Sequence, residues 1–360
     1  MNKETNQESN SGPRREEPLP ISTIGRDASP MAQILRSREF SVISVLFLLC
    51  VGMLFTSQRG NFYSLRNFQQ ILLEVSLLSI FAIGETIVII TGGIDLSLGS
   101  MIAFTGMLAA LLTTTLDEKM FTGAAVGLAI LITVLFSLGV GAWHTVLIHK
   151  VRLPPFVVTL VSLLILRSQS YVMRHHQQIP VPSTKYPTFD FLANGSLPLG
   201  RLSIPFPALI LLLVAVAAHL ILSRTTTGRY LYSVGSNEQA TTLSGVNVFK
   251  VKLFAYGFAA FLSGIAGLLY MGYGGQGDPS AGQSYELDAV AAAVVGGASL
   301  TGGQGSVMGT VIGACLVRAI LSAISLSLSE PDMWRGTVVG TVLLLAVLTT
   351  AIRQNRSQTH

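Results

Sequence analysis

A few ionisable residues interrupt long apolar stretches of this 360-residue sequence, and any chemistry inside those stretches would depend on them. A charged side chain at the centre of a bilayer costs about 2.5–3.5 kcal/mol on insertion scales, so such residues mark either a polar pathway, such as a proton relay, or internal hydrogen bonding and capping. Glu74 and Glu85 are eleven positions apart, close to three helical turns, and are expected on one helix face directed into the bundle. Asp95 is expected to cap the helix that follows it, because acidic groups favour helix N-termini. The whole set comprises Glu74, Glu85, Asp95, His144, Arg167 and Arg318.

Two glycine-rich segments, 92–99 and 296–305, stand at the ends of apolar runs. They share a loose pattern of a glycine pair, then Asp or Ser, Leu, Ser or Thr, and later Gly-Ser, although the spacing differs by two residues. Glycine lets helices approach closely and lets the backbone bend, and paired interruptions in two halves of a transporter point to its translocation path. The match is too short to establish a repeat, and the expected topology runs both segments in the same direction. The candidates for the translocation path or for helix breaks are Glu85, Gly92, Gly93, Asp95, Gly99, Gly296, Gly297, Gly302 and Gly303.

A polar connection at 223–250 carries the signals of a short helix bounded by glycines. Ser236 and Gln239 have the spacing of a capping box, and Gly245 suits the residue just after a helix. A helix of two turns is marginally stable in water without packing. It is therefore either a surface connector or an element that the rest of the protein, or a partner, holds in place.

The composition indicates that most of the chain is buried in a membrane. Hydrophobic residues make up 50% of the sequence, charged residues make up 11%, and the mean hydropathy is +0.59, whereas an average soluble domain carries about 25% charged residues. A spanning helix needs about 20 predominantly apolar residues, and continuous rather than alternating hydrophobicity excludes a β-barrel. The run at 288–297 is too short to cross alone, and it is interpreted as half of a broken helix or as a short helix packed beneath its neighbours. The ten candidate runs are 40–56, 71–90, 98–116, 121–148, 155–171, 207–222, 251–270, 288–297, 307–326 and 335–351.

Basic residues near the ends of these ten runs are unequally divided between the two sides of the membrane. Lys and Arg number eleven on one side and seven on the other, which places both termini in the cytoplasm. The expected domains are a disordered cytoplasmic tail at 1–39, a transmembrane domain at 40–352 and a cytoplasmic tail at 353–360. Inside the transmembrane domain, 223–250 is the cytoplasmic loop and 172–206 is a large periplasmic loop. The first apolar run begins too far from the N-terminus for a cleaved signal peptide.

Several functional classes lack their sequence signals. No lysine follows a glycine, so there is no P-loop, and neither a His-Glu-x-x-His nor a Gly-x-Ser-x-Gly motif occurs. The basic residues punctuate apolar runs and do not form the clusters typical of nucleic-acid binding. Cys50 and Cys315 both lie in apolar runs and are interpreted as unpaired core thiols without metal-ligand spacing. The chain is therefore not expected to be an enzyme or to bind a metal, a cofactor or nucleic acid.

Four segments resemble the membrane-spanning permease subunits of bacterial ABC importers for monosaccharides, the group of ribose, xylose, galactose, rhamnose and autoinducer-2 systems. The segments are 91–100 (TGGIDLSLGS), 153–160 (LPPFVVTL), 228–245 and 285–314, and the last of them is long and quite specific. Together they cover most of 74–351. The resemblance implies an all-α integral membrane fold like that of a type II ABC importer permease, with about ten transmembrane helices and glycine-rich breaks.

The resemblance also implies partners and a mechanism. A periplasmic sugar-binding protein would deliver the substrate to two permease subunits, identical or different, in the bacterial inner membrane. Cytoplasmic ATPase subunits would bind the ATP and Mg²⁺ that this chain does not bind itself. The short helix near 237–244 would be the coupling helix that sits in a cleft of the ATPase. Its candidate residues are Asn237, Glu238, Gln239, Ala240, Thr241, Leu243 and Gly245.

A secondary transporter driven by protons or cations is the alternative hypothesis, with Glu74, Glu85 and Asp95 as its relay. The loop at 223–250 and the missing P-loop favour the ABC permease. The loop resembles the part of such permeases that contacts an ATPase, and a chain without a P-loop needs that ATPase as a separate partner. The sequence does not distinguish pentoses, hexoses, deoxysugars or autoinducer-2 as the substrate, and it does not identify the residues that contact it.

Overall fold

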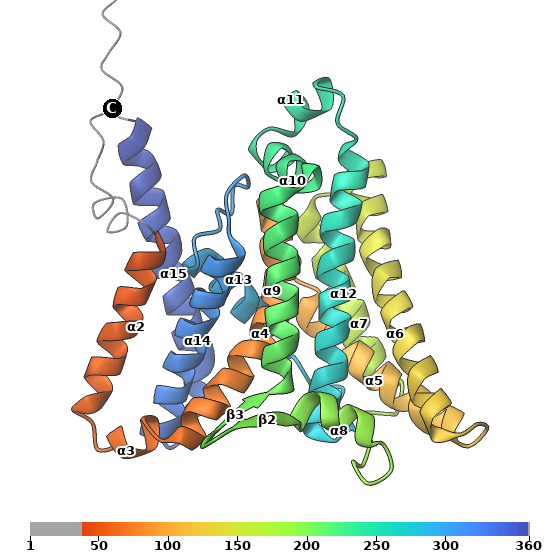
Figure 1. Cartoon of the computed structure of the whole chain (residues 1–360). Helices are drawn as coiled ribbons and strands as arrows, with labels where there is room; N and C mark the ends of the chain where they lie inside the picture. Colours follow the sequence, from red (N-terminus) through yellow and green to blue (C-terminus); the bar gives the residue numbers. More distant parts are fainter. Residues whose placement is uncertain (1–37, 359–360) are drawn as a thin grey trace, which may run out of the picture. The chain divides into compact units, whose positions relative to one another are not determined.

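The computed structural model describes residues 38–358 of the chain, and these form one predominantly helical unit (Figure 1). The tail expected at 1–39 lies outside the described residues except for Arg38 and Glu39, which begin the first helix. The tail expected at 353–360 lies outside them only in its last two residues, because the final helix continues to Gln358.

The helices are α2 (Arg38–Leu54), α3 (Arg59–Phe62), α4 (Leu65–Ile90), α5 (Leu98–Asp117), α6 (Thr122–Thr145) with a π-helical extension (Val146–Lys150), α7 (Pro155–Val172), α8 (Pro187–Asn194), α9 (Phe206–Arg224), α10 (Thr226–Ser236), α11 (Glu238–Leu243), α12 (Val248–Gly274), α13 (Tyr285–Val295), α14 (Val307–Ser327) and α15 (Pro331–Gln358). The strands are β1 (Ile179–Pro180), β2 (Ser196–Leu199), β3 (Leu202–Pro205) and β4 (Gln276–Gly277).

Seven helices of the described chain are long and apolar enough to cross a membrane: α4, α5, α6 with its π-helical extension, α7, α9, α12 and α14. The apolar parts of α2 and α15, Val42–Leu54 and Met333–Leu348, are shorter. The run expected at 288–297 forms α13, which has only 11 residues. Thus the chain is a multi-pass membrane protein, and all ten expected runs are helical, but three of them fall short of a full span.

The centre of the unit is formed by α4 and α12, which pack against each other and carry most of the main apolar core. Sixteen consecutive residues of α4, from Val75 to Ile90, are buried. This stretch includes polar side chains such as Glu85 and Thr86, which are costly against lipid, so the helix is placed inside the bundle. By contrast, α6, α7 and α9 expose large apolar side chains such as Leu131, Leu164 and Leu213. Exposed apolar surface on long apolar helices is the surface expected to contact lipid.

The long connection at 172–206 contains more structure than a loop. It holds α8 and a hairpin in which β2 pairs antiparallel with β3 from Ser196↔Pro205 to Leu199↔Leu202. Gly200 has φ +64° in the two-residue turn, where a positive φ matches the twist of a hairpin. A second small pair joins β1 to β4. The expectation of a purely helical fold missed these strands, because two to four residues are too few to show an alternating pattern.

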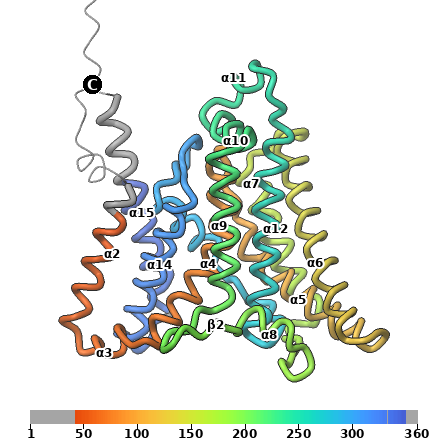
Figure 2. The backbone as a smooth tube through the Cα atoms, viewed as in Figure 1, coloured from red at the N-terminus to blue at the C-terminus, as the bar shows by residue number. Residues whose placement is uncertain are grey.

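The two ends of the helical unit differ in what they carry (Figure 1). Helices α10 and α11 lie at one end, while α3, α8, β2 and β3 lie at the other end. The backbone trace shows the same division, with the connection between α13 and α14 reaching towards α10 (Figure 2). The expected cytoplasmic loop and the expected periplasmic loop are thus at opposite ends of the bundle.

Candidate functional site

Three backbone segments that are far apart in the sequence meet close to the start of α11. They are the end of α4, the end of α10 and the connection from α13 to α14. The Gly303 N–H donates to the Ile90 carbonyl oxygen (2.9 Å). A Cβ on Gly235 would overlap that same carbonyl and would lie 2.6 Å from the Gly303 nitrogen. We call this meeting point of Ile90, Gly92, Gly235, Gly302 and Gly303 the glycine junction. Only residues without side chains permit such an approach of three backbones.

The first segment of the junction is formed by the way α4 ends. Gly92 has φ +81°, its N–H donates to the Ile89 carbonyl (2.9 Å), and the Gly93 N–H donates to the Val88 carbonyl (3.2 Å). This is a Schellman cap, which needs a left-handed residue just past the helix. A Cβ on Gly93 would overlap the hydroxyl of Tyr256 in α12, so this glycine also permits close packing. The break after α4 is therefore specified by local backbone chemistry.

The second segment is the irregular chain between α13 and α14. Gly296 packs against the backbone of Gly309, where a Cβ would overlap the Gly309 carbonyl, and Gly297 has φ +99°. The loop is closed by backbone hydrogen bonds from Ser299 N–H to the Gln304 carbonyl (3.0 Å) and from the Gly302 N–H to the Ser299 carbonyl (2.8 Å). Gly302 and Gly303 have φ +87° and +73°, values that favour glycine.

The third segment, the end of α10, holds the loop in place. The Tyr232 hydroxyl donates to the Gly305 carbonyl (2.8 Å). Burial raises the pKa of Tyr232, so its hydroxyl stays protonated and remains a donor. A Cβ on Gly302 would lie 2.6 Å from the Gly235 carbonyl and 3.0 Å from the backbone of Gly92. The two glycine-rich segments of the sequence therefore meet each other, and they meet at Gly235, in the last turn of α10 before α11.

The short helix expected in this loop is α11, with one correction at its start. Asn237, not Ser236, is the N-cap, because its side chain accepts the Ala240 N–H (2.9 Å). Ser236 still belongs to α10, and its hydroxyl donates to the Tyr232 carbonyl (2.8 Å). The extended backbone between the two helices falls at Asn237, so the predicted capping box was wrong: the residue three positions after the N-cap is Ala240, which cannot complete one.

The end of α11 follows the prediction. Gly245 has φ +83°, its N–H donates to the Thr242 carbonyl (3.0 Å), and the Val246 N–H donates to the Thr241 carbonyl (3.3 Å). This is again a Schellman cap. Thr241 is buried against the protein, whereas Gln239, Ala240 and Leu243 are exposed. Leu243 is 89% exposed, so α11 presents an apolar side chain away from the bundle.

An ion pair holds α11 to α12. The Lys252 ammonium lies 2.8 Å from both carboxylate oxygens of Glu238. The Lys252 side chain is 11% exposed and the Glu238 side chain 46% exposed, so the lysine is the buried partner. Glu238 was predicted as a residue of the coupling helix, and its pairing with Lys252, fourteen positions away, was not predicted.

The unequal burial of the pair predicts an unequal response to mutation. Glu238→Gln leaves the ammonium without a charged partner and should cost about 1–3 kcal/mol of stability. Lys252→Met removes the buried charge as well and should cost less than about 1 kcal/mol. Thermal unfolding of the two purified variants in detergent shows which of them has lost more stability. A Lys252→Met protein that melts below Glu238→Gln would contradict the assignment of Lys252 as the buried partner.

Glu85 and Asp95 form a buried acidic pair at the break between α4 and α5. The Asp95 N–H lies 3.2 and 3.3 Å from the two Glu85 carboxylate oxygens and donates to them. Asp95 Oδ1 accepts from the N–H (2.9 Å) and the hydroxyl (2.6 Å) of Ser97, the N-cap residue of α5. Asp95 thus shapes the turn into α5, but the expectation that it caps this helix was wrong, because the N-cap is Ser97 and Asp95 bonds to Ser97 and not to an N–H of the helix. Both carboxylates are completely buried.

His144 completes this buried cluster from α6. Its Nδ1 lies 3.7 Å from Asp95 Oδ2, and its Nε2 lies 2.9 Å from the Ser162 hydroxyl of α7. The cluster therefore connects the break after α4 to two further helices by side chains. Glu74 lies elsewhere: it accepts a hydrogen bond from Gln70 Nε2 (2.8 Å) and lines a cavity. The carboxylates of Glu74 and Glu85 face different surroundings, because α4 passes from a polar cavity into the packed core.

Two further predicted residues, Gly99 and Arg167, contact the segment between α12 and α13 or the start of α13. Gly99 packs closely against Gly282 and Glu286. Arg167 Nη1 donates to the carbonyls of Pro279 (3.1 Å) and Ala281 (2.7 Å). Each therefore has a structural contact that accounts for its residue type.

Comparison with known proteins identifies the chain. Residues 67–347 match the family model described as "Branched-chain amino acid transport system / permease component". The chain belongs to this permease family. The permease is 36% identical over 311 residues to the ribose import permease of Escherichia coli, which covers 86% of the permease and 92% of the relative.

Other relatives agree with this one. The ribose import permease of Haemophilus influenzae is 37% identical over 316 residues, covering 88% of the permease and 93% of the relative. The xylose transport system permease of the same organism is 32% identical over 369 residues, covering 87% of the permease and 96% of the relative. No solved structure matches the permease. The resemblance to monosaccharide permeases is confirmed, and the permease is a transport protein of the membrane.

Proposed function

We propose that the permease is the membrane-spanning subunit of an ATP-binding cassette importer and forms the translocation path for a sugar or a sugar-like substrate. The observation that carries the proposal is the match to ribose and xylose import permeases over 86–88% of the chain. The family description names branched-chain amino acids instead. The substrate class therefore rests on the individual relatives, whose names agree on a pentose.

In this proposal the chain works with three kinds of partner. A cytoplasmic ATPase binds ATP and Mg²⁺ and hydrolyses the nucleotide, a periplasmic binding protein delivers the sugar, and a second permease subunit completes the membrane part. The exposed apolar side chain of Leu243 on α11 supports the proposal of an ATPase partner. A short surface helix with so exposed a leucine is suited to bury it in another protein.

The proposed topology has ten membrane-inserted segments in the bacterial inner membrane, in the manner of a type II ABC importer. The seven long apolar helices are joined by α2, α13 and α15. Helices α10 and α11 are cytoplasmic, and α3, α8 and the β2–β3 hairpin are periplasmic. Both termini are cytoplasmic, which agrees with the excess of basic residues on that side.

The glycine junction provides the route by which the ATPase acts on the translocation path. Gly235 lies in the last turn of α10, three residues before α11 begins, and it contacts both the end of α4 and the loop before α14. A movement of α11 is therefore passed to both helix breaks at once by backbone contact. Nucleotide can drive import only if the ATPase contacts the two states of the permease differently, and α11 is the element placed to sense that difference.

Reconstitution tests the proposal. The permease, its ATPase and its binding protein in proteoliposomes should accumulate ribose or xylose when ATP is supplied, and should not accumulate L-leucine. Uptake that persists without ATP and collapses with an uncoupler would establish the secondary transporter instead. Accumulation of L-leucine alone would retain the ABC mechanism and replace the substrate.

A further inference from the structure

A cavity of about 310 Å³ is lined by residues of α4, α12, α14 and α15 and by Tyr285 of α13. Its residues on α4 begin just after α3, which lies at the end of the unit opposite to α10 and α11 (Figure 1). Its lining includes Asn67, Gln70, Glu74, Arg318, Ser322 and Ser325. Small-molecule sites in proteins begin at about 300 Å³, so the space suits one small ligand. In the proposed topology it faces the periplasmic side, where the binding protein delivers the substrate.

Two facing stripes of polar side chains wall this cavity. On α4 the polar positions 67, 70 and 74 are spaced by three and four residues, and on α14 the positions 318, 322 and 325 are spaced by four and three. Such spacing places each set on one helix face over about 10 Å. The Ser322 hydroxyl donates to Asn67 Oδ1 (3.0 Å), and Gln70 Nε2 donates to the Tyr273 hydroxyl oxygen (3.3 Å). Polar stripes inside apolar helices are costly unless something polar lies between them.

One wall of the cavity carries two guanidinium groups, those of Arg318 and Arg335. Asp288 pairs with both Arg318 (3.3 Å) and Arg335. The Arg318 side chain is only 7% exposed, and the Nε atoms of both arginines are buried without a hydrogen-bond partner in the described part of the chain. The Tyr285 ring lies against both guanidinium groups, with centroid distances of 4.9 Å for Arg335 and 5.5 Å for Arg318. These Nε atoms have almost no accessible surface, so the donors that a ligand in the cavity can meet are the Nη atoms of the two guanidinium groups, which favour acceptor oxygens.

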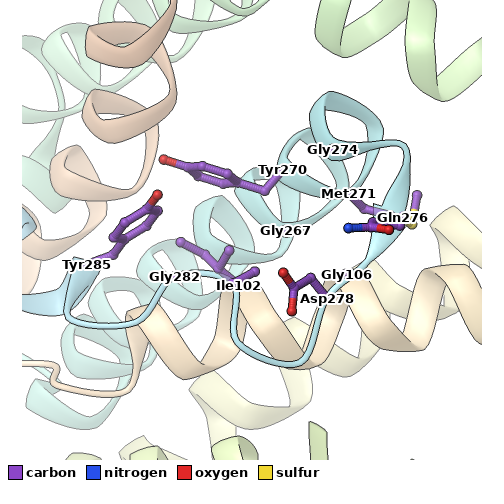
Figure 3. A pocket seen from close by; sticks show the side chains of 11 residues that line it. Ile102, Gly106, Gly267, Tyr270, Met271, Gly274, Gln276, Asp278, Gly282 and Tyr285 are labelled. Atoms are coloured by element: carbon purple, nitrogen blue, oxygen red, sulfur yellow. The ribbon is translucent and has the colours of Figure 1, made fainter. Parts of the chain in front are cut away.

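The cavity ends at a pair of tyrosine rings, Tyr270 and Tyr285, whose centroids are 5.2 Å apart. On their other side lies a second cavity of about 190 Å³, and both rings line it as well (Figure 3). Its wall includes Gly106, Gly267 and Gly282, which place backbone instead of side chains at its surface. The two rings therefore separate the polar cavity from a smaller space further inside the bundle.

We propose that the cavity between α4 and α14 binds one uncharged monosaccharide during import, with the guanidinium groups of Arg318 and Arg335 donating to sugar oxygens and Glu74 accepting from sugar hydroxyls. The inference rests on the proposed function and adds a binding site within a single permease chain. Two arginines are balanced by two carboxylates, Asp288 and Glu74, so an uncharged ligand needs no further counter-charge. The donors and acceptors are spread along both stripes, which suits a polyol better than an amino acid with one polar end.

Thiol protection tests occupancy directly. Ser325→Cys, introduced with Cys50→Ala and Cys315→Ala, places a single thiol in the cavity at an exposed position. D-ribose or D-xylose at ten times its dissociation constant should slow labelling by a membrane-impermeant thiol reagent about tenfold, because about one site in eleven is then free. Ser327→Cys in the same background, on α14 but outside the lining, should be labelled at the same rate with and without sugar. Protection by L-leucine alone, or by no ligand, would overturn the assignment.

Uptake by the reconstituted importer separates this inference from the proposed function. Glu74→Gln should lower ATP-driven sugar uptake about tenfold or more, the effect of losing a hydrogen bond to a charged group. Glu118→Gln removes an exposed acidic group near the same end and should leave uptake unchanged. If the wild-type protein imports neither sugar, the proposed function fails. If it imports sugar, and Glu74→Gln does so equally well, only the binding site is refuted.

Discussion

Replacing Gly235 with alanine should abolish most sugar uptake while the permease still inserts in the membrane. The new Cβ would overlap the Ile90 carbonyl oxygen and would lie 2.6 Å from the Gly303 nitrogen. Because these contacts are backbone atoms, the strain cannot be relieved by turning a side chain. Overpacking of this kind costs about 1–3 kcal/mol, which corresponds to about a 5- to 150-fold change in an equilibrium. We expect ATP-driven uptake in proteoliposomes to fall by about that factor.

A matched glycine separates a loss of coupling from a general effect of the substitution. Gly127 in α6 has no atom within 4 Å of an added Cβ, so Gly127→Ala should transport like the wild type. Size-exclusion chromatography and thermal unfolding in detergent show whether Gly235→Ala assembles. If Gly235→Ala assembles and imports sugar at the wild-type rate, the glycine junction does not transmit movement.

A second glycine tests whether the junction acts as one unit. Gly302→Ala places a side chain at φ +87° and 2.6 Å from the Gly235 carbonyl, and the left-handed conformation alone costs about 1–2 kcal/mol. Residues in direct contact show non-additive effects. The double variant should therefore lose less activity than the product of the two single losses. Strict additivity would indicate that the two glycines act separately.

The positions of the long helices could be predicted from the sequence, and some of their ends agree within one residue, as for α5 and α7, but the start of α4 could not be predicted. The run expected at 71–90 is the apolar part of α4, which begins at Leu65 because the Ser64 side chain accepts the Asn67 N–H (3.2 Å). A search for apolar residues cannot see a polar first turn. The same omission hid the cavity, whose stripe on α4 includes Asn67 and Gln70.

The glycine junction shows a different limit of sequence reasoning. Both glycine-rich segments were identified as helix breaks, and the loop at 223–250 was identified as the site of a short helix. Their meeting could not be predicted, because it depends on backbone atoms of residues such as Ile90, Gly235 and Gly303, which are far apart in the sequence. Glycine has no side chain that would indicate its neighbour. Gly235 was visible only as one boundary of the loop, and its contacts required the fold.

The second large effect is expected at Leu243, where the permease presents an apolar side chain that is 89% exposed. Burying a leucine in a partner contributes about 1.5–3 kcal/mol. Leu243→Ala should therefore weaken binding of the ATPase about 10-fold or more, since 1.36 kcal/mol is a factor of ten. Leu243→Pro should do more, because proline also disrupts the last turn of α11 at a cost of about 3 kcal/mol. Titration of the purified ATPase onto the permease in nanodiscs measures both.

The expected consequence of these Leu243 variants for transport is uncoupling: the permease remains in the membrane, and ATP hydrolysis no longer drives sugar uptake. Leu243→Met retains an apolar side chain of similar volume and should keep most of the affinity. Leu199, which is 61% exposed on β2 at the other end of the unit, is the matched control, and Leu199→Ala should bind the ATPase like the wild type. Normal ATP-driven uptake by Leu243→Pro would contradict a coupling role for α11. The glycine junction would then need another source of movement, because α11 is the exposed element that begins three residues after Gly235.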